Sequence, residues 1–311
     1  MVKVNGSAVF GLDVRPPGLV YAAVRMCPVF GGTLQKLDTD AVTTMPGVLR
    51  VVVLSRSTTG APAGVAVIAK TWWQAKLAVA ALPVVWDEGP HAKLSSEEIS
   101  RELADALDAE SGFTYYRTGD QAAAQNAVKK INADYAAPFL AHAALEPVNC
   151  TAQVKDGKLT LWVSTQVPTL AVSAAAKAAQ LAPEQVTLHA TYIGGGFGRR
   201  LETDMVTQAV AIALEAAGAP VQVIWDREQD IAHDVYRPAA LARFSAALDA
   251  AGNVVAYESK SASGSVSQHM MRRAFGLPEI GPDKSTVEGV FDQMYEFPNQ
   301  RIAHVIVPSA V

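Results

Sequence analysis

The amino-acid sequence predicts an α+β protein with more than one domain. Its 311 residues exceed what one ordinary core accommodates, so the length favours about two domains. Half of the residues are hydrophobic and 18% are charged, a composition that buries large cores and lies outside the disordered range. Strand-like runs and helical patterns follow one another without a repeat of solenoid period. Together these observations predict globular units that mix strands with helices.

The first expected domain covers residues 1–90. Strands are predicted at residues 19–25, 48–54 and 64–69, where β-branched or alternating apolar residues occur. A short helical turn is expected between the first two, beginning near Thr39. Thr71 should cap a helix that ends at Leu82, because Pro83 cannot continue it. Spacing places one apolar face of this helix on Trp73, Leu77, Ala80 and Ala81.

Residues 91–135 are the least hydrophobic part of the chain, and we interpret them as a connecting segment. A charged helix is expected from Ser95 to about Glu110. The polar stretch at residues 114–134 has no pattern that requires a core.

The second expected domain covers residues 136–311. Strands are predicted at residues 158–164, 185–193 and 221–225, and a hairpin is predicted with strands 242–248 and 254–259. An alanine-rich helix should cover residues 168–181. A further amphipathic helix is expected at residues 203–217, with an apolar stripe of Met205, Val206, Ala209, Val210 and Ala213.

Residues 194–200 (GGGFGRR) lie between an expected strand and an expected helix. Consecutive glycines leave backbone amides bare, and bare amides near the positive end of a helix dipole can bind an anionic group. Arg199 and Arg200 would add donors suited to phosphate. The spacing fits neither the dinucleotide-binding GxGxxG pattern nor a Walker A loop. A tight turn without a ligand is the alternative interpretation.

Other polar residues carry weaker indications. His142 and Glu146 are four apart and could share a helix face as zinc ligands, but no HExxH pattern is present and Pro147 would end a helix there. A structural or pocket-lining role is therefore favoured. His189, within an apolar strand, is expected in the core. Three acidic residues are expected to form a solvated loop group: Glu228, Asp230 and Asp234.

Charge and cysteine content exclude several classes of protein. The formal net charge is −4, and scattered basic residues indicate no nucleic-acid surface. The longest apolar run, at residues 77–86, is too short to span a bilayer. Cys27 and Cys150 are too few and too far apart to hold a zinc ribbon or an iron–sulfur cluster alone. Buried free thiols are expected, and a single disulfide stays open.

Residues 192–200 (YIGGGFGRR) resemble the cofactor loop of the xanthine oxidase family. The doubled arginine is more similar to the branch of isoquinoline 1-oxidoreductase beta subunits. Further segments that resemble this branch are residues 138–150 (PFLAHAALEPVNC), 162–168 (WVSTQVP) and 234–238 (DVYRP). Residues 27–32 (CPVFGG) and 45–48 (MPGV) resemble the family's α/β hammerhead domain. The resemblance implies a hammerhead domain at residues 1–90 and the N-terminal part of a molybdopterin-binding α/β domain at residues 136–311.

The resemblance also implies an activity. Members of the family hydroxylate an aldehyde carbon, or a carbon next to nitrogen, with water as the oxygen source. Their molybdenum is held by molybdopterin, often as the cytosine dinucleotide, and not by protein side chains. Carried over by position, Gln166 would hydrogen-bond an oxo ligand of molybdenum. The other residues implied to contact the cofactor are Gly195, Gly196, Phe197, Gly198 and, with weaker support from the family, Arg199.

Partners of the parent protein follow from the same resemblance. A small subunit with two [2Fe–2S] clusters and, in many relatives, a cytochrome c electron acceptor are implied, with no iron–sulfur cluster in this chain. A small-molecule substrate is expected, without nucleic acid or a membrane span. The first residues lack the apolar stretch of a signal peptide, and the parent protein is expected in the bacterial periplasm or cytoplasm.

The chain ends in an apolar strand-like stretch, from which we expect a piece of a longer protein. In the family, a glutamate in a late Gly-Glu segment serves as the general base, so that residue is expected beyond Val311. This piece alone should therefore not turn over an aldehyde or N-heterocycle. The alternative hypothesis is a non-catalytic phosphate- or nucleotide-binding protein that uses the same strand–loop–helix arrangement.

Overall fold

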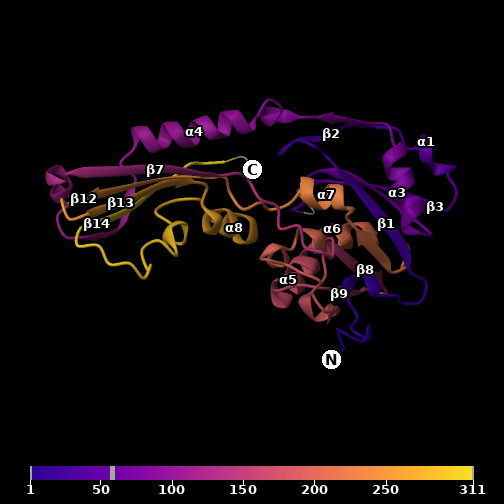
Figure 1. Ribbon diagram of the computed structural model, residues 1–311. Coiled ribbons are helices and arrows are strands. Elements are labelled where there is room, and N and C mark those ends of the chain that lie inside the picture. The colour runs from indigo at the N-terminus through magenta and orange to yellow at the C-terminus, as the bar shows by residue number, and fades with distance from the viewer. Residues whose placement is uncertain (1, 57–59, 310–311) are drawn as a thin grey trace. The chain divides into compact units, whose positions relative to one another are not determined.

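A computed structural model describes residues 2–56 and 60–309 (Figure 1). The chain forms two compact units. The first consists of residues 1–92 and 141–235, and the second of residues 93–140 and 236–311. Each unit thus combines segments that are far apart in the sequence. The assignment of residues 1–90 to a hammerhead domain, of residues 91–135 to a connecting segment and of residues 136–311 to a molybdopterin-binding domain stays a prediction.

The first unit is built on a mixed seven-stranded sheet in the order β10-β9-β8-β11-β1-β4-β3. Pairing is parallel between β1 and β11 and between β9 and β10, and antiparallel between the other neighbours. The strands are β1 (Val20–Met26), β3 (Val48–Leu54), β4 (Gly64–Ala69), β8 (Asn149–Lys155), β9 (Lys158–Val163), β10 (Val186–Ala190) and β11 (Val221–Ile224). Every strand predicted for this unit is present, and β10 is shorter than expected.

Helices cover both faces of this sheet. On one face, α5 (Pro168–Ala179) and α6 (Asp204–Ala213) pack on the larger hydrophobic core. The apolar stripe predicted for α6 is confirmed, since all five of its residues are buried. On the other face lie α1 (Asp40–Thr43) and α3 (Trp72–Ala81), over a second core. Because β4 lies between β1 and β3 and is covered on both faces, all six of its residues are buried.

The ends of α3 are as predicted, but its buried face is not. Thr71 caps the helix by accepting a hydrogen bond from the Gln74 backbone N–H, 3.3 Å away. Ala75 and Ala78 are fully buried, whereas the side chains expected inside, Trp73 and Leu77, are 60% and 46% exposed. The small alanines let the helix backbone lie close to β1 and β4. The helix is therefore oriented so that its small residues face the sheet, which allows close packing, and its large apolar residues face outward.

Substitutions on α3 test this orientation. Ala78→Leu forces extra methylene groups into a filled space and is expected to cost about 1–3 kcal/mol of unfolding free energy. Leu77→Ala, on the exposed side, is expected to cost less than about 1 kcal/mol. Urea unfolding of the two variants measures both values. A larger loss of unfolding free energy for Leu77→Ala than for Ala78→Leu would show that Leu77 lies on the buried face of α3, as the sequence pattern predicted.

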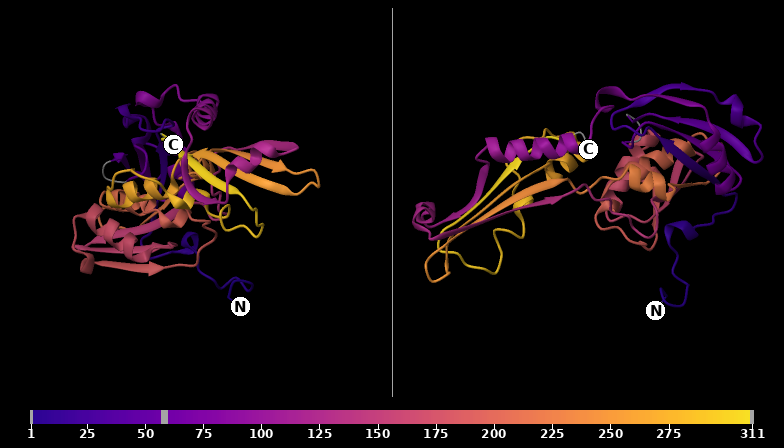
Figure 2. Two further views of the ribbon diagram at one scale, coloured as in Figure 1. Left: turned by 90° about the vertical axis from the view of Figure 1, so that its left-hand side faces the viewer. Right: turned by 45° about the horizontal axis from the view of Figure 1, so that its top comes forward.

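The second unit contains a five-stranded sheet in the order β6-β14-β13-β12-β7. Its strands are β6 (Phe113–Thr118), β7 (Lys129–Ala137), β12 (Ala240–Leu248), β13 (Val254–Ser263) and β14 (Gln300–Ile306). The predicted hairpin is confirmed as β12 and β13. The predicted charged helix, α4 (Ser96–Ala109), runs along the sheet and packs Leu103 and Leu107 on it (Figure 2). The remaining helix is α8 (Val266–Phe275).

The polar stretch at residues 114–134 is not a simple connection. It contributes β6 and the start of β7, which are the two edge strands of this sheet. Seven of the nine residues of β7 are exposed. An edge strand that faces water on both sides carries no apolar alternation, so its sequence resembles a loop.

The other regular elements are small. A two-stranded sheet pairs β2 (Thr33–Leu37) with β5 (Val84–Asp87), and α7 (Arg227–Ala232) lies near the glycine loop. The 3-10 helices are Gly11–Asp13, Gly89–His91, Gln121–Asn126, Pro183–Gln185, Arg199–Leu201 and Lys284–Val287. Cys27 and Cys150 are buried free thiols, as expected. Over residues 2–56 and 60–309, no helix has the length and apolar character that crossing a membrane requires.

Candidate functional site

The glycine loop, residues 194–198, lies between β10 and the 3-10 helix Arg199–Leu201. The α-helix α6 begins only at Asp204, so the expected α-helix does not follow the loop directly. A helix dipole acts mainly within its first turn. The anion-binding argument from a helix N-terminus therefore fails for this loop, and any affinity must come from the loop itself.

The loop backbone adopts an unusual conformation. Gly195 and Gly198 have φ values of 106° and 107°, which glycine tolerates because it lacks a Cβ atom. Phe197 has a φ of 54°, a left-handed conformation that is uncommon for a bulky residue. Its side chain is 80% exposed. The loop thus places an aromatic side chain outside the protein at a local cost in backbone energy, a combination that is frequent at functional sites.

Four consecutive backbone N–H groups of the loop, from Gly195 to Gly198, have no hydrogen-bond acceptor among the residues that the structure describes. Their neighbours are satisfied: Gly194 N–H donates to Glu146 Oε2 at 3.0 Å, and Arg199 N–H donates to the Gly196 carbonyl at 2.8 Å. Successive amides around left-handed residues form concave sites for anions. The loop therefore offers its free donors to a ligand or to water.

Glu146 holds the loop in place. Its carboxylate, 6% exposed, accepts hydrogen bonds from the backbone N–H groups of Leu12 at 3.1 Å and Gly194 at 3.0 Å. It also accepts one from the Asn149 amide at 3.2 Å. A Cβ atom on Gly194 would stand 2.5 Å from the Cβ atom of Glu146. One buried carboxylate thus joins three segments of the first unit, and glycine is required where the loop meets it.

Arg200 provides the positive charge for Glu146. The residue is fully buried, and its Nη2 donates to the Glu146 carbonyl at 2.9 Å and lies 3.5 Å from the carboxylate. Burial lowers the pKa of this guanidinium, although the Glu146 charge opposes the shift. Arg200 therefore supports the loop from beneath and does not point toward solvent.

Arg199 is also turned inward. Its guanidinium donates to both carboxylate oxygens of Asp204, at 2.9 and 2.7 Å, and its Nε lies 3.0 Å from Asp234 Oδ1. The group is 2% exposed and lies over the Trp225 ring at 5.5 Å. The Arg199 guanidinium was expected to bind a phosphate, but in the structure it pairs with the carboxylates of Asp204 and Asp234. Its predicted contact with a cofactor stays a prediction.

Gln166 lies against the middle of the loop. Its backbone N–H donates to the Arg200 carbonyl at 3.0 Å, and its side chain is exposed. A Cβ atom on Gly196 would stand 3.1 Å from Gln166 Oε1 and 3.2 Å from Arg200 Cγ. Gln166 and the glycines, far apart in sequence, are therefore brought together. Their contact with a cofactor stays a prediction.

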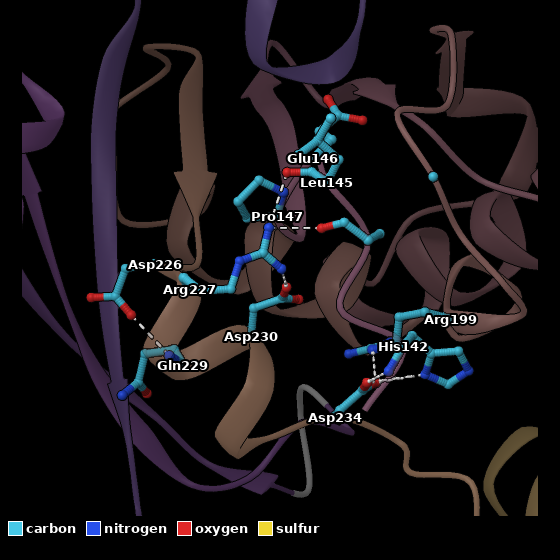
Figure 3. A network of polar contacts seen from close by, with 12 residues as sticks. His142, Leu145, Glu146, Pro147, Arg199, Asp226, Arg227, Gln229, Asp230 and Asp234 are labelled. Carbon is cyan, nitrogen blue, oxygen red and sulfur yellow. Dashed lines mark hydrogen bonds and ion pairs between the residues drawn. The ribbon is translucent and has the colours of Figure 1, made fainter. Parts of the chain in front are cut away.

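His142 approaches the loop from another side. Its Nδ1 lies 3.0 Å from both carboxylate oxygens of Asp234 (Figure 3). The shared helix face expected for His142 and Glu146 is wrong, because this segment is irregular and Ala143 has a φ of 44°. The two side chains have different partners. Within the described ranges, no group of three or more His, Cys, Asp or Glu side chains could hold a metal ion.

Of the three acidic residues expected to form a solvated group, Glu228 is exposed as expected, but the other two are buried. Asp230 and Asp234 are 6% and 5% exposed. Asp230 pairs with Arg227 at 2.6 Å, and Arg227 also donates to the carbonyls of Ala144 and Leu145, at 2.7 and 2.9 Å (Figure 3). These contacts fix the segment that carries Glu146. Neither the burial nor the pairing could be recognised from sequence spacing.

The expectation for His189 is also wrong. The residue is exposed and stacks on Trp162, with 5.5 Å between the ring centroids. β10 is an edge strand of the sheet, so its residues are less covered than the apolar pattern indicated.

Burial of His233 predicts a pH dependence of stability. Burial lowers the pKa of His233 from 6.5 to about 4, so the unfolded chain binds the proton first as the pH falls. Stability should therefore fall on acidification through this interval, by on the order of 3 kcal/mol, and level off below it. Urea unfolding across the interval should show this loss in the wild type relative to His233→Gln. An equal pH dependence in both proteins would contradict the assignment.

Comparisons with known proteins identify the family of the chain. Residues 106–307 match the molybdopterin cofactor-binding domain family. The chain is 34% identical over 260 residues to the isoquinoline 1-oxidoreductase subunit beta of Brevundimonas diminuta, covering 79% of this chain and 32% of that protein. It is 28% identical over 289 residues to an aldehyde oxidoreductase molybdenum-binding subunit of Escherichia coli, covering 85% and 39%. The chain thus spans about a third of the length of these relatives.

The fold is shared with a solved enzyme. The aldehyde oxidoreductase from Desulfovibrio gigas superposes with a TM-score of 0.67 at 21% identity, covering 97% of this chain and 37% of the other. The predicted α+β fold class is therefore confirmed.

Proposed function

Because the chain belongs to the xanthine oxidase family of molybdopterin-binding subunits, we propose that its glycine loop forms part of the binding site for molybdopterin carrying molybdenum. The four unpartnered N–H groups of residues 195–198 carry this proposal. These N–H groups can donate hydrogen bonds to an anionic cofactor, and they lie within residues 106–307, which match the molybdopterin cofactor-binding domain family.

The residues around the loop fit such a group. Gly196 leaves free the space that a side chain would fill between Gln166 and Arg200. Glu146 and Arg200 hold the loop from the buried side, so the free amides are ordered before a ligand arrives. Gln166 would orient the cofactor through its exposed amide. When bound, molybdopterin supplies the redox chemistry, and this chain's residues bind and orient it.

The activity we propose for the complete protein is oxidation of an aldehyde or an N-heterocycle with water as the oxygen source. The names of two relatives support these substrate classes, since one is an isoquinoline oxidoreductase subunit and the other an aldehyde oxidoreductase subunit. A phosphate- or nucleotide-binding protein without molybdenum is less favoured, because the family match includes the loop.

Isotopically labelled water tests this activity. The complete protein with its partner subunits is incubated with an aromatic aldehyde or an N-heterocycle, an artificial electron acceptor and labelled water. The product should carry oxygen from the water, and the acceptor should be reduced in proportion. Product that carries oxygen from dioxygen, or the absence of any oxidised product from either substrate class, would contradict the proposal.

The finer assignments are part of the same proposal. The cofactor is the cytosine dinucleotide form, the electrons leave through a small [2Fe–2S] subunit and then a cytochrome c, and residues 1–90 form a hammerhead domain ahead of the molybdopterin-binding domain. The relatives that are named as subunits support a multi-subunit enzyme. Hydrolysis of the released cofactor should yield cytidine monophosphate in an amount equal to the pterin, and pterin without the nucleotide would exclude the dinucleotide form.

A further inference from the structure

His142 lies beside the glycine loop and has one ring nitrogen free. We propose that His142 is a ligand-binding residue of this site: its Nε2 donates a hydrogen bond to an anionic oxygen of the bound cofactor, while Asp234 positions the ring. The inference rests on the proposed function. It adds a side chain that can carry positive charge to a site otherwise made of backbone N–H groups and the Gln166 amide.

The position of the ring is the first argument. His142 Nε2 lies 3.5 Å from the point where a Cβ atom on Gly198 would stand. Gly198 has no side chain, so this edge of the ring faces the end of the run of unpartnered N–H groups. The His142 side chain is 19% exposed. It is therefore largely held by protein and still open to a ligand.

The orientation of the ring is the second argument. A carboxylate only accepts hydrogen bonds, so Nδ1 carries a proton where it meets Asp234 at 3.0 Å. The backbone N–H of His142 donates to the same carboxylate, which fixes the residue at two points. Nε2 has no partner among the residues that the structure describes, so it is the ring atom left for a ligand.

The charges around the ring are the third argument. The buried carboxylate of Asp234 receives both the His142 ring and the Arg199 guanidinium (Figure 3). Arg199 also pairs with Asp204. Two carboxylates therefore share one guanidinium, so this group carries a net negative charge beside the imidazole ring. Burial alone would raise the pKa of Asp234, but the hydrogen bonds from His142 and the nearby charges hold it below its ordinary value, so the carboxylate stays ionised.

Two amide substitutions separate the two nitrogens of the ring. The side-chain nitrogen of asparagine comes near the position of Nδ1, and that of glutamine near the position of Nε2. His142→Asn should keep the contact with Asp234 and lose the contact with the ligand. His142→Gln should restore a donor beside Gly198. His189→Gln, on the exposed face of an edge strand, is the matched control.

The measurement is the pterin and molybdenum retained by the complete protein after prolonged dialysis, with the thermal unfolding midpoint as a second readout. We expect His142→Asn to retain at least about tenfold less cofactor than wild type, and His142→Gln to stay within about threefold. Retention by His142→Asn equal to wild type, or equal losses in both variants, would assign His142 a structural role only. A wild-type protein without pterin and molybdenum would instead contradict the proposed function itself.

Chemical modification tests the inference without a substitution. Diethyl pyrocarbonate acylates accessible imidazole nitrogens, and peptide mass spectrometry reports the extent at each histidine. His142 should be acylated in cofactor-depleted wild-type protein and protected in the loaded protein, whereas His189 should react equally in both. Equal acylation of His142 in the two states would overturn the proposal.

Discussion

Glu146→Ala is expected to lower the unfolding free energy of the first unit by about 3–5 kcal/mol, the range for breaking a buried ion pair by removing one partner. The substitution would leave the fully buried Arg200 without its counter-charge. It would also leave the N–H groups of Leu12 and Gly194 without an acceptor. The glycine loop should become less ordered as a result, and cofactor retention should fall with stability.

Urea unfolding measures this loss, with two comparison variants. Glu146→Gln keeps the shape and one acceptor but not the charge, so it should fall between alanine and wild type. Glu184→Ala removes an exposed carboxylate from the same unit and should change stability by less than about 0.5 kcal/mol. A loss for Glu146→Ala no larger than that for Glu184→Ala would show that the carboxylate does not organise the loop.

Gly196→Val is expected to lower retention of the cofactor by at least about tenfold. A first carbon at this position already stands 3.1 Å from Gln166 Oε1 and 3.2 Å from Arg200 Cγ, and valine adds two methyl groups there. Gly196→Ala needs only a small shift of the exposed Gln166 side chain, so it should lose less. The difference in retention between the two variants would come from steric contact of the added side chain and not from backbone strain, because the φ of Gly196 lies outside the left-handed region.

The matched control is Gly264→Ala, where the nearest atom to an added Cβ stands at 3.6 Å, an ordinary contact. Dialysis followed by pterin and molybdenum analysis should give wild-type retention for Gly264→Ala, reduced retention for Gly196→Ala and at least about tenfold less than wild type for Gly196→Val. Full retention by a folded Gly196→Val variant would remove residue 196 from the binding site.

Most of the fold follows from local patterns in the sequence. Six strands of the seven-stranded sheet were recognisable because they carry apolar runs or alternation, as at residues 64–69, whereas β8 was not predicted. Caps such as Thr71 and Ser95 marked helix starts, because their side chains accept backbone hydrogen bonds. Edge strands were harder. β7 was taken for a connection and His189 for a core residue, since the pattern of a strand does not reveal whether a neighbour covers it.

The candidate site was only half visible in the sequence. The run of glycines indicated bare amides, and the structure leaves four of them unpartnered. The supporting contacts were hidden, because Glu146 meets Gly194 across 48 residues and His142 meets Asp234 across 92. The sequence around an arginine also does not show whether its side chain points into the protein or toward a ligand. Arg199 and Arg200 were expected to face a phosphate, whereas their distant carboxylate partners hold both guanidinium groups inside the protein.

The central claim is that the glycine loop belongs to a molybdopterin site, and the content of the purified complete protein tests it most directly. The protein is denatured, its metals are quantified by mass spectrometry, and the released small molecules are separated and identified. We expect molybdenum and a pterin in equal amounts, about one of each per chain. A released nucleotide with neither molybdenum nor pterin would contradict this assignment and favour a nucleotide-binding protein.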